Sequence, residues 1–231
     1  MSNDEFAQHI SRQFNDELEE VRSHLLSMGG LVEKQVADAV NSLVNADSAL
    51  ALEVLTTEKK INSMELAIDE ECTRVIALRQ PAASDLRLLV VTTKANIDLE
   101  RMGDEASKIA KMAIKLAEDG ELPKGYTEVR HIGTHVCTML HDALDAFSRF
   151  DADVALQVVR EDRVVDMEYE SAMRQLVTFM MEDPRYITRV LNVLWSLRSL
   201  ERIGDHARNI AEHVIYLVNG RDVRHLPLDE L

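Results

Sequence analysis

Apolar residues recur at steps of three and four along almost the whole chain, which is the spacing of one face of an α-helix. The pattern begins with Phe14, Leu18, Val21, Leu25 and Met28. It continues past Gly29 and Gly30 to about residue 45, and it predicts one long helix with a bend at the glycine pair. The same spacing predicts two more helices, over 48–78 and 85–117.

The helical pattern returns after a segment that contains Gly120, Pro123 and Gly125, residue types that interrupt helices. Three further helices are predicted, over 128–150, then to about residue 181, and from about 187 to 219. The sequence Leu-Glu-Arg-Met-Gly-Asp at 99–104 is matched by Leu-Glu-Arg-Ile-Gly-Asp at 200–205. A repeat of roughly a hundred residues is too long for a solenoid and indicates a duplicated bundle.

The predicted fold is therefore all-α, with six helices in two tandem three-helix bundles. The predicted boundaries are 1–118 for the first bundle, 119–127 for a linker, 128–219 for the second bundle and 220–231 for a C-terminal tail. Composition agrees with this fold, because 46% of the residues are hydrophobic but only 4% are aromatic. The core must then consist mainly of Leu, Val, Ile, Ala and Met, a set that favours helices over sheets.

Acidic residues outnumber basic ones, 41 against 26, and give a formal net charge of −15. A polyanion would repel such a chain, so no binding to nucleic acid is expected. No apolar run reaches the length of a membrane span, and the N-terminal residues lack the apolar core of a signal peptide. We therefore expect no membrane insertion and a cytoplasmic location. The acidic excess suits a protein that binds cations or the basic surface of a partner.

Each copy of the repeated motif carries two carboxylates one helical turn apart, Glu100/Asp104 and Glu201/Asp205. Residues at i and i+4 share a helix face, so these like charges repel each other unless a cation neutralises them. Oxygen ligands suit hard divalent cations such as Mg²⁺, Ca²⁺ or Mn²⁺, and clusters with iron are a further option. The motif is therefore a candidate metal site.

The neighbouring helix of each bundle supplies a further carboxylate if the chain turns where predicted. Turns near residues 81–83 and 183 bring Glu65 level with Glu100, and Asp166 level with Glu201. Carboxylates from two helices could then converge on one cation. His206 directly follows the second motif and points away from its face by about 100°, so it is expected at the surface.

A solvated surface face is the simpler interpretation of these acidic pairs. The same spacing occurs at Asp16/Glu20, Glu65/Asp69 and Asp166/Glu170, and exposed ion pairs contribute little to stability. A carboxylate-bridged metalloenzyme or a metal-storage bundle is the alternative function. However, the chain has no P-loop, no GxSxG, and no convincing nucleophile or His-rich ligand set, so no enzyme is predicted. A third interpretation is a structural bundle whose acidic face docks a basic partner.

Several segments together resemble the PhoU family over nearly the whole chain. They are the two repeated motifs, the segments 14–19, 28–30, 64–70, 79–87 and 180–183, and Tyr169. The resemblance implies two three-helix bundles whose acidic motifs bind metal ions or clusters in some members. It also implies a cytoplasmic, non-enzymatic regulator of phosphate homeostasis that is often a homodimer.

The resemblance further implies partners. PhoU-like proteins link the phosphate ABC transporter, through its ATPase PstB, to the sensor histidine kinase PhoR. They keep the phosphate-starvation response off when phosphate is plentiful, and they restrain phosphate uptake. The protein is therefore expected to be a negative regulator that acts as an adaptor between these two partners.

The two copies of the motif differ in the residues that follow them. The second copy continues with Asn209 and Glu212, which extend its acidic and amide face, whereas the first has Lys108 and Lys111. Lysine is a cation and does not ligate metals, so the second face is expected to bind divalent cations more tightly than the first. The candidate metal ligands are Glu65, Glu100, Asp104, Asp166, Glu201, Asp205, Asn209 and Glu212.

Overall fold

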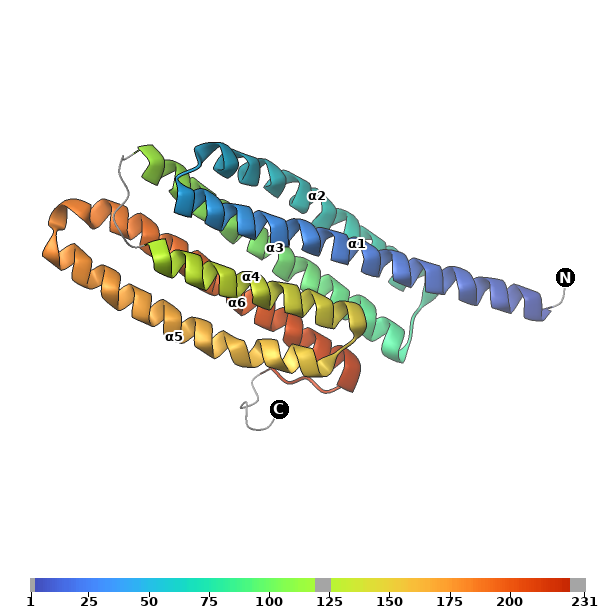
Figure 1. Cartoon of the computed structure of the whole chain (residues 1–231). Coiled ribbons are helices and arrows are strands. Elements are labelled where there is room, and N and C mark those ends of the chain that lie inside the picture. Colours follow the sequence, from blue (N-terminus) through green and yellow to red (C-terminus); the bar gives the residue numbers. More distant parts are fainter. Residues whose placement is uncertain (1–2, 119–125, 225–231) are drawn as a thin grey trace.

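A computed structural model describes the backbone of residues 3–118 and 126–224, and the side chains of residues 12–118 and 127–224. Within these ranges the chain forms six α-helices and one short 3₁₀ helix, with no strand (Figure 1). The all-α prediction is confirmed. The elements are α1 (Asn3–Asn45), α2 (Ser48–Arg79), α3 (Ala83–Glu118), α4 (Tyr126–Arg149), α5 (Ala152–Glu182), η1 (Pro184–Tyr186) and α6 (Ile187–Asn219).

The first and second helices of each half are joined by the same kind of turn. Ala46 and Phe150 adopt the left-handed backbone conformation, with φ of 52° and 55°. The next residues, Asp47 and Asp151, each cap the following helix, because the carboxylate accepts a hydrogen bond from the backbone N–H three residues later. Such a cap satisfies donors that the first helical turn leaves unpaired. The duplicated aspartate therefore fixes where α2 and α5 begin.

The predicted domain boundaries fall largely on helix ends. Most of the predicted linker, 119–125, lies outside the described residues, as does 225–231 of the predicted tail. Gly220 follows α6 with φ of 69° and ends it, because glycine adopts this left-handed conformation without a steric penalty. In the part of the chain that the structure describes, no helix is both long and apolar enough to cross a bilayer.

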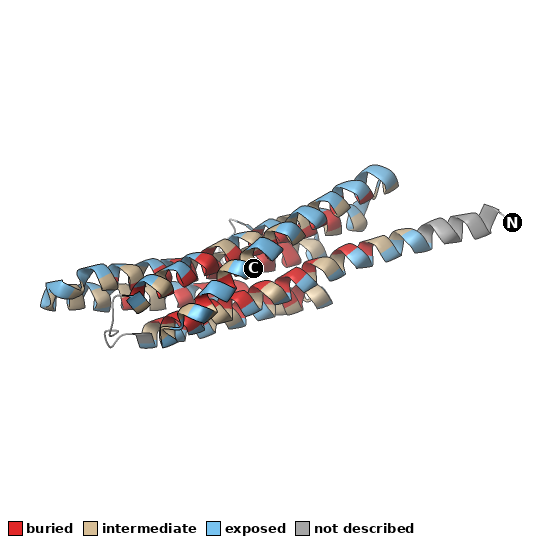
Figure 2. Cartoon of the chain, turned by 90° about the horizontal axis from the view of Figure 1, so that it is seen from above, coloured by how far each residue is buried: buried red, intermediate tan, exposed pale blue. Residues whose placement is uncertain are grey.

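The two halves lie side by side along most of their length (Figures 1 and 2). In the first half α3 contacts α1 and α2, and in the second half α6 contacts α4 and α5. The halves meet where α3 contacts α6 and where α1 contacts α4. Each half can be aligned with the other along the chain, so both joining contacts pair equivalent helices.

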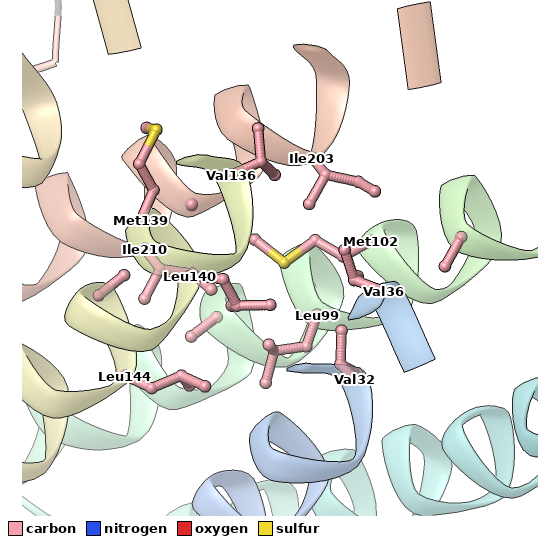
Figure 3. Close-up of a cluster of buried hydrophobic side chains, with 14 of the residues drawn as sticks. Val32, Val36, Leu99, Met102, Val136, Met139, Leu140, Leu144, Ile203 and Ile210 are labelled. Carbon is pink, nitrogen blue, oxygen red and sulfur yellow. The ribbon is translucent and has the colours of Figure 1, made fainter. Parts of the chain in front are cut away.

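Buried apolar side chains from both halves form one continuous core. Figure 3 shows Val36 and Met102 of the first half meeting Val136, Leu140 and Ile203 of the second. Because no polar layer separates these side chains, the two bundles share their hydrophobic stabilisation. The halves are therefore parts of one rigid scaffold.

Two glycines allow α1 and α4 to approach closely. A Cβ atom on Gly29 would lie 2.6 Å from Leu144 Cδ2, and one on Gly133 would lie 2.7 Å from Val40 Cγ1. Gly29 in the first half corresponds to Gly133 in the second, and Val40 corresponds to Leu144, so the same contact is made twice. The helix α1 runs unbroken through Gly29. Gly29 therefore allows close packing of α1 against α4, whereas a bend at this glycine was expected from the sequence.

Candidate functional site

The acidic residues of the second half gather on the faces of α5 and α6 that meet. Glu201 and Glu212 of α6 are largely covered by neighbouring side chains, while Asp205 is half-exposed. Asp162 of α5 is buried and joins them, and Asp166 lies one turn further along α5. Four of these five residues were expected from the sequence to be candidate ligands, whereas Asp162 was not.

An arginine lies among these carboxylates. The Arg208 guanidinium donates a hydrogen bond from Nη1 to Asp162 Oδ2. It also lies 3.7 Å from Asp205 Oδ1 through Nη1, and 3.6 Å from Glu212 Oε1 through Nε. Arg208 therefore supplies positive charge at the place where a metal ion was expected from the sequence. Its spacing was a usable signal, because it is three residues after Asp205 and four before Glu212.

Burial raises the pKa of several carboxyl groups on this face. For Glu201 burial is the main cause, and the negative charge of Asp205 adds to it. For Asp162 burial also raises the pKa, although the charge of Arg208 opposes the shift. Glu201 Oε1 pairs with Arg198, whereas Oε2 is buried without a hydrogen-bond partner in the described part of the protein. The face therefore keeps an unbalanced negative oxygen.

Glu100 of the first half lies near two other acidic residues, Asp104 and Glu65. Burial, and then the negative charges of Asp104 and Glu65, raise the pKa of Glu100, so these carboxylates lie close enough to interact. Lys108, however, does not lie with them. Its ammonium pairs with Glu105 Oε1 at 2.9 Å, on the side of α3 that faces α6. Placing Lys108 on the first acidic face was wrong, because helix rotation directs it toward the second half.

The arrangement fits a hydrated cation better than a fully protein-ligated one. Among the described residues, no group of three or more His, Cys, Asp or Glu side chains is placed to hold a metal ion. Mg²⁺ keeps several waters and binds proteins through one or two carboxylates, which either acidic face can supply. The prediction for the candidate ligands is therefore that they bind a divalent cation weakly and through water molecules.

A buried polar cluster joins α3 to α6 at the centre of the molecule. Asp98 of α3, only 7% exposed, lies 2.8 Å from His206 Nδ1 and 3.5 Å from His213 Nε2. It also accepts a hydrogen bond from Asn209 Nδ2 at 3.2 Å. The expectations for His206 and Asn209 were both wrong, because these residues lie on the stripe of α6 that faces α3. A sequence pattern on one helix does not reveal such a partner helix.

The pKa of Asp98 is low despite its burial. Burial alone would raise it, but hydrogen bonds from His206, His213 and Asn209 outweigh that effect and lower the pKa from 3.8 to about 2. A carboxyl whose pKa is lowered by folding stabilises the protein above its unfolded pKa. That stabilisation is lost as the pH falls from about 3.8 through about 2.

We expect Asp98→Asn to lower the free energy of unfolding by about 1–2 kcal/mol at neutral pH, because charged hydrogen bonds are replaced by neutral ones. The difference in unfolding free energy between the variant and the native protein should shrink as the pH falls from about 3.8 to about 2, where Asp98 becomes protonated. Urea unfolding at a series of pH values measures this. A difference that stays constant down to about pH 2 would show that the Asp98 charge contributes nothing.

The PhoU domain family matches this chain in two segments, residues 25–113 and 129–214. Each segment falls within one of the two predicted bundles. A Pseudomonas aeruginosa protein named phosphate-specific transport system accessory protein PhoU homolog is 64% identical over 231 residues, 100% of this chain and 96% of that protein. The Escherichia coli phosphate-specific transport system accessory protein PhoU is 50% identical over 223 residues, 96% and 92% of the two chains.

Two solved structures share the fold. The crystal structure of PhoU from Pseudomonas aeruginosa has a TM-score of 0.88 and 67% sequence identity, and covers 90% of this chain and 100% of that one. The phosphate transport system regulatory protein PhoU from Streptococcus pneumoniae has a TM-score of 0.84 and 30% identity, with coverage of 91% and 99%. The tandem arrangement of three-helix bundles is common to all three.

Proposed function

The chain belongs to the PhoU family, and on that premise we propose that it is the accessory and regulatory protein of a phosphate-specific transport system. The observation that carries this proposal is identity of 50–64% over nearly the full length of relatives that bear this name. The family is one of accessory proteins and not of enzymes. The carboxylate-bridged metalloenzyme is therefore set aside.

We propose further that the protein is a cytoplasmic adaptor that keeps the phosphate-starvation response off when phosphate is plentiful. Its partners in this proposal are the transporter ATPase PstB and the sensor histidine kinase PhoR. The single shared core supports such a role, because a rigid scaffold loses little conformational entropy on docking. The net charge of −15 would speed encounter with a basic patch on a partner.

Co-purification from cells grown in high and low phosphate tests the adaptor. The tagged protein should retain both the kinase and the ATPase at high phosphate. If acidic faces make the contact, retention should fall as salt rises, because exposed charges are screened beyond about 8 Å at physiological ionic strength. Failure to retain either partner would contradict the adaptor proposal. Light scattering of the pure protein tests the homodimer that we propose on the family resemblance.

We propose that the first acidic face binds hydrated divalent cations more tightly than the second, which reverses the expectation from sequence. The reason is that Arg208 already offsets part of the negative charge of the second face, whereas Lys108 is turned away from the first. Calorimetric titration with Mg²⁺ or Mn²⁺ should show a larger loss for Glu100→Gln/Asp104→Asn than for Glu201→Gln/Asp205→Asn. Equal losses in the two double variants would contradict this order.

A further inference from the structure

A pocket of about 500 Å³ opens between α3 and α6, and its residue Glu105 lies about two helical turns along α3 from Asp98. Glu105 and Ser199 lie at its base, where Ser199 Oγ donates a 2.8 Å hydrogen bond to Glu105 Oε2. The remaining lining residues are Lys108, Met112, Trp195, Arg198 and Arg202. A volume of this size is typical of sites that hold small molecules.

Positive charge exceeds negative charge in this pocket. Its one carboxylate, Glu105, is buried and fully engaged, since Oε1 lies 2.8 Å from Arg202 Nη1 and 2.9 Å from Lys108 Nζ. An ammonium has three N–H donors and a guanidinium has five, so both side chains keep donors beyond those that Glu105 uses. Arg198 adds a third cation, which pairs with Glu201 outside the pocket. In a chain of net charge −15, this local excess of positive charge favours an anion.

One wall of the pocket is an exposed aromatic ring. Trp195 is 64% exposed, although tryptophan is among the residues that proteins bury most extensively on average. Met112 is the only other apolar residue in the pocket lining, so the pocket offers the indole little apolar surface to pack against. A flat aromatic face beside three cations suits a ligand that has a planar ring and an anionic group, because rings stack on indole and anions accept from Lys and Arg.

The equivalent position on the other side of the α3–α6 contact is occupied differently. In the repeat, Asp98 of the first half corresponds to Ser199 of the second, and Glu105 corresponds to His206. Asn209 and His213 stand where the pocket has Lys108 and Met112, and both approach Asp98. The duplication of the bundle therefore does not account for the cationic pocket. The pocket depends on Lys108, Arg198 and Arg202, which have no cationic counterparts around Asp98 except Arg101.

We infer that this pocket binds a nucleotide, with the base stacked on Trp195 and the phosphates held by Lys108, Arg198 and Arg202. The pocket supplies a ring surface and surplus N–H donors on adjoining walls, and a nucleotide carries both complementary groups. The inference goes beyond the adaptor function and does not depend on it. Occupancy would place a small-molecule signal at the junction between the two halves.

Trp195 is the only tryptophan in the chain, so tryptophan fluorescence reports on the pocket directly. ADP added to the full-length protein should quench this fluorescence in a saturable way, with half-saturation below about 1 mM. Adenosine and inorganic phosphate, titrated separately, should each bind at least about tenfold more weakly, because each offers only one of the two interactions. Free tryptophan amide, titrated in parallel, corrects for absorption by ADP.

Two variants locate the site. Lys108→Gln should weaken ADP binding about tenfold, by loss of a charge-assisted hydrogen bond. Trp195→Ala, followed by calorimetry, should weaken it by a similar factor through loss of stacking. Both side chains are at least half exposed, so both variants should fold. Arg101→Gln is the matched control, because Arg101 occupies in the first motif the position that the pocket residue Arg202 occupies in the second. The Arg101→Gln protein should bind ADP with unchanged affinity.

The inference is overturned if ADP causes no saturable quenching up to millimolar concentration. It is also overturned if Lys108→Gln and Arg101→Gln bind ADP equally well. Inorganic phosphate that binds as tightly as ADP would overturn the nucleotide assignment, because the aromatic wall would then contribute nothing.

Discussion

Replacing Arg208 by glutamine should lower the free energy of unfolding by about 3 kcal/mol at neutral pH, because it leaves a buried carboxylate without its cation. Asp162 is 4% exposed and receives a hydrogen bond from Arg208. Removing one partner of a buried ion pair costs about 3–5 kcal/mol. The lower end applies here because the Arg208 side chain is 35% exposed. Urea unfolding followed by circular dichroism measures the change.

The stability lost by Arg208→Gln should be partly restored at low pH. Burial already raises the pKa of Asp162, and Arg208 opposes that rise, so the pKa will increase further without the arginine. Protonation then removes the unpaired charge, and the deficit shrinks as the pH falls through that higher pKa. Arg163→Gln, on the exposed side of α5, is the control and should change stability by less than about 0.5 kcal/mol. Equal stabilities for the two variants would contradict the structural role of Arg208.

Gly29→Val should lower the free energy of unfolding by about 2 kcal/mol, because the new side chain would overlap Leu144 of α4. Even a Cβ atom at residue 29 would lie 2.6 Å from Leu144 Cδ2. The neighbouring glycine gives a matched control, since a Cβ on Gly30 would have no such neighbour within 4 Å. Thermal unfolding of Gly29→Val and Gly30→Val compares the two positions within one helix.

A double variant tests whether the contact with Leu144 is the cause. Leu144→Ala removes the side chain that Gly29→Val would strike, so the double variant should be less destabilised than the sum of the singles by about 1 kcal/mol or more. Additive effects would show that α1 and α4 do not meet at Gly29. The corresponding contact of Gly133 with Val40 should behave in the same way.

Helices and their ends could be predicted closely because their signals are local. The apolar spacing from Phe14 onward, the aspartates before α2 and α5, and Gly220 all act within one or two helical turns. The duplicated motif also identified the two halves. Glu100 and Glu65 interact as expected because a helical hairpin fixes the register of its two helices.

The contacts between the two halves could not be predicted, because periodicity on one helix does not say which helix faces it. His206 was expected at the surface for this reason, yet it pairs with Asp98. Lys108 and Asn209 were assigned to the acidic faces, although each lies one stripe away and faces the opposite half. The metal site was predicted from the carboxylates alone, and the Arg208 guanidinium that lies among them was not considered.

The regulatory role is tested most directly by a phosphate-starvation reporter in cells that lack the protein. Without it, reporter expression in phosphate-replete medium should rise to near the level seen in starvation, and returning the intact chain should restore repression. No catalysed reaction should be lost. A reporter that stays silent at high phosphate after removal of the protein would contradict the proposal that this PhoU family member holds the starvation response off.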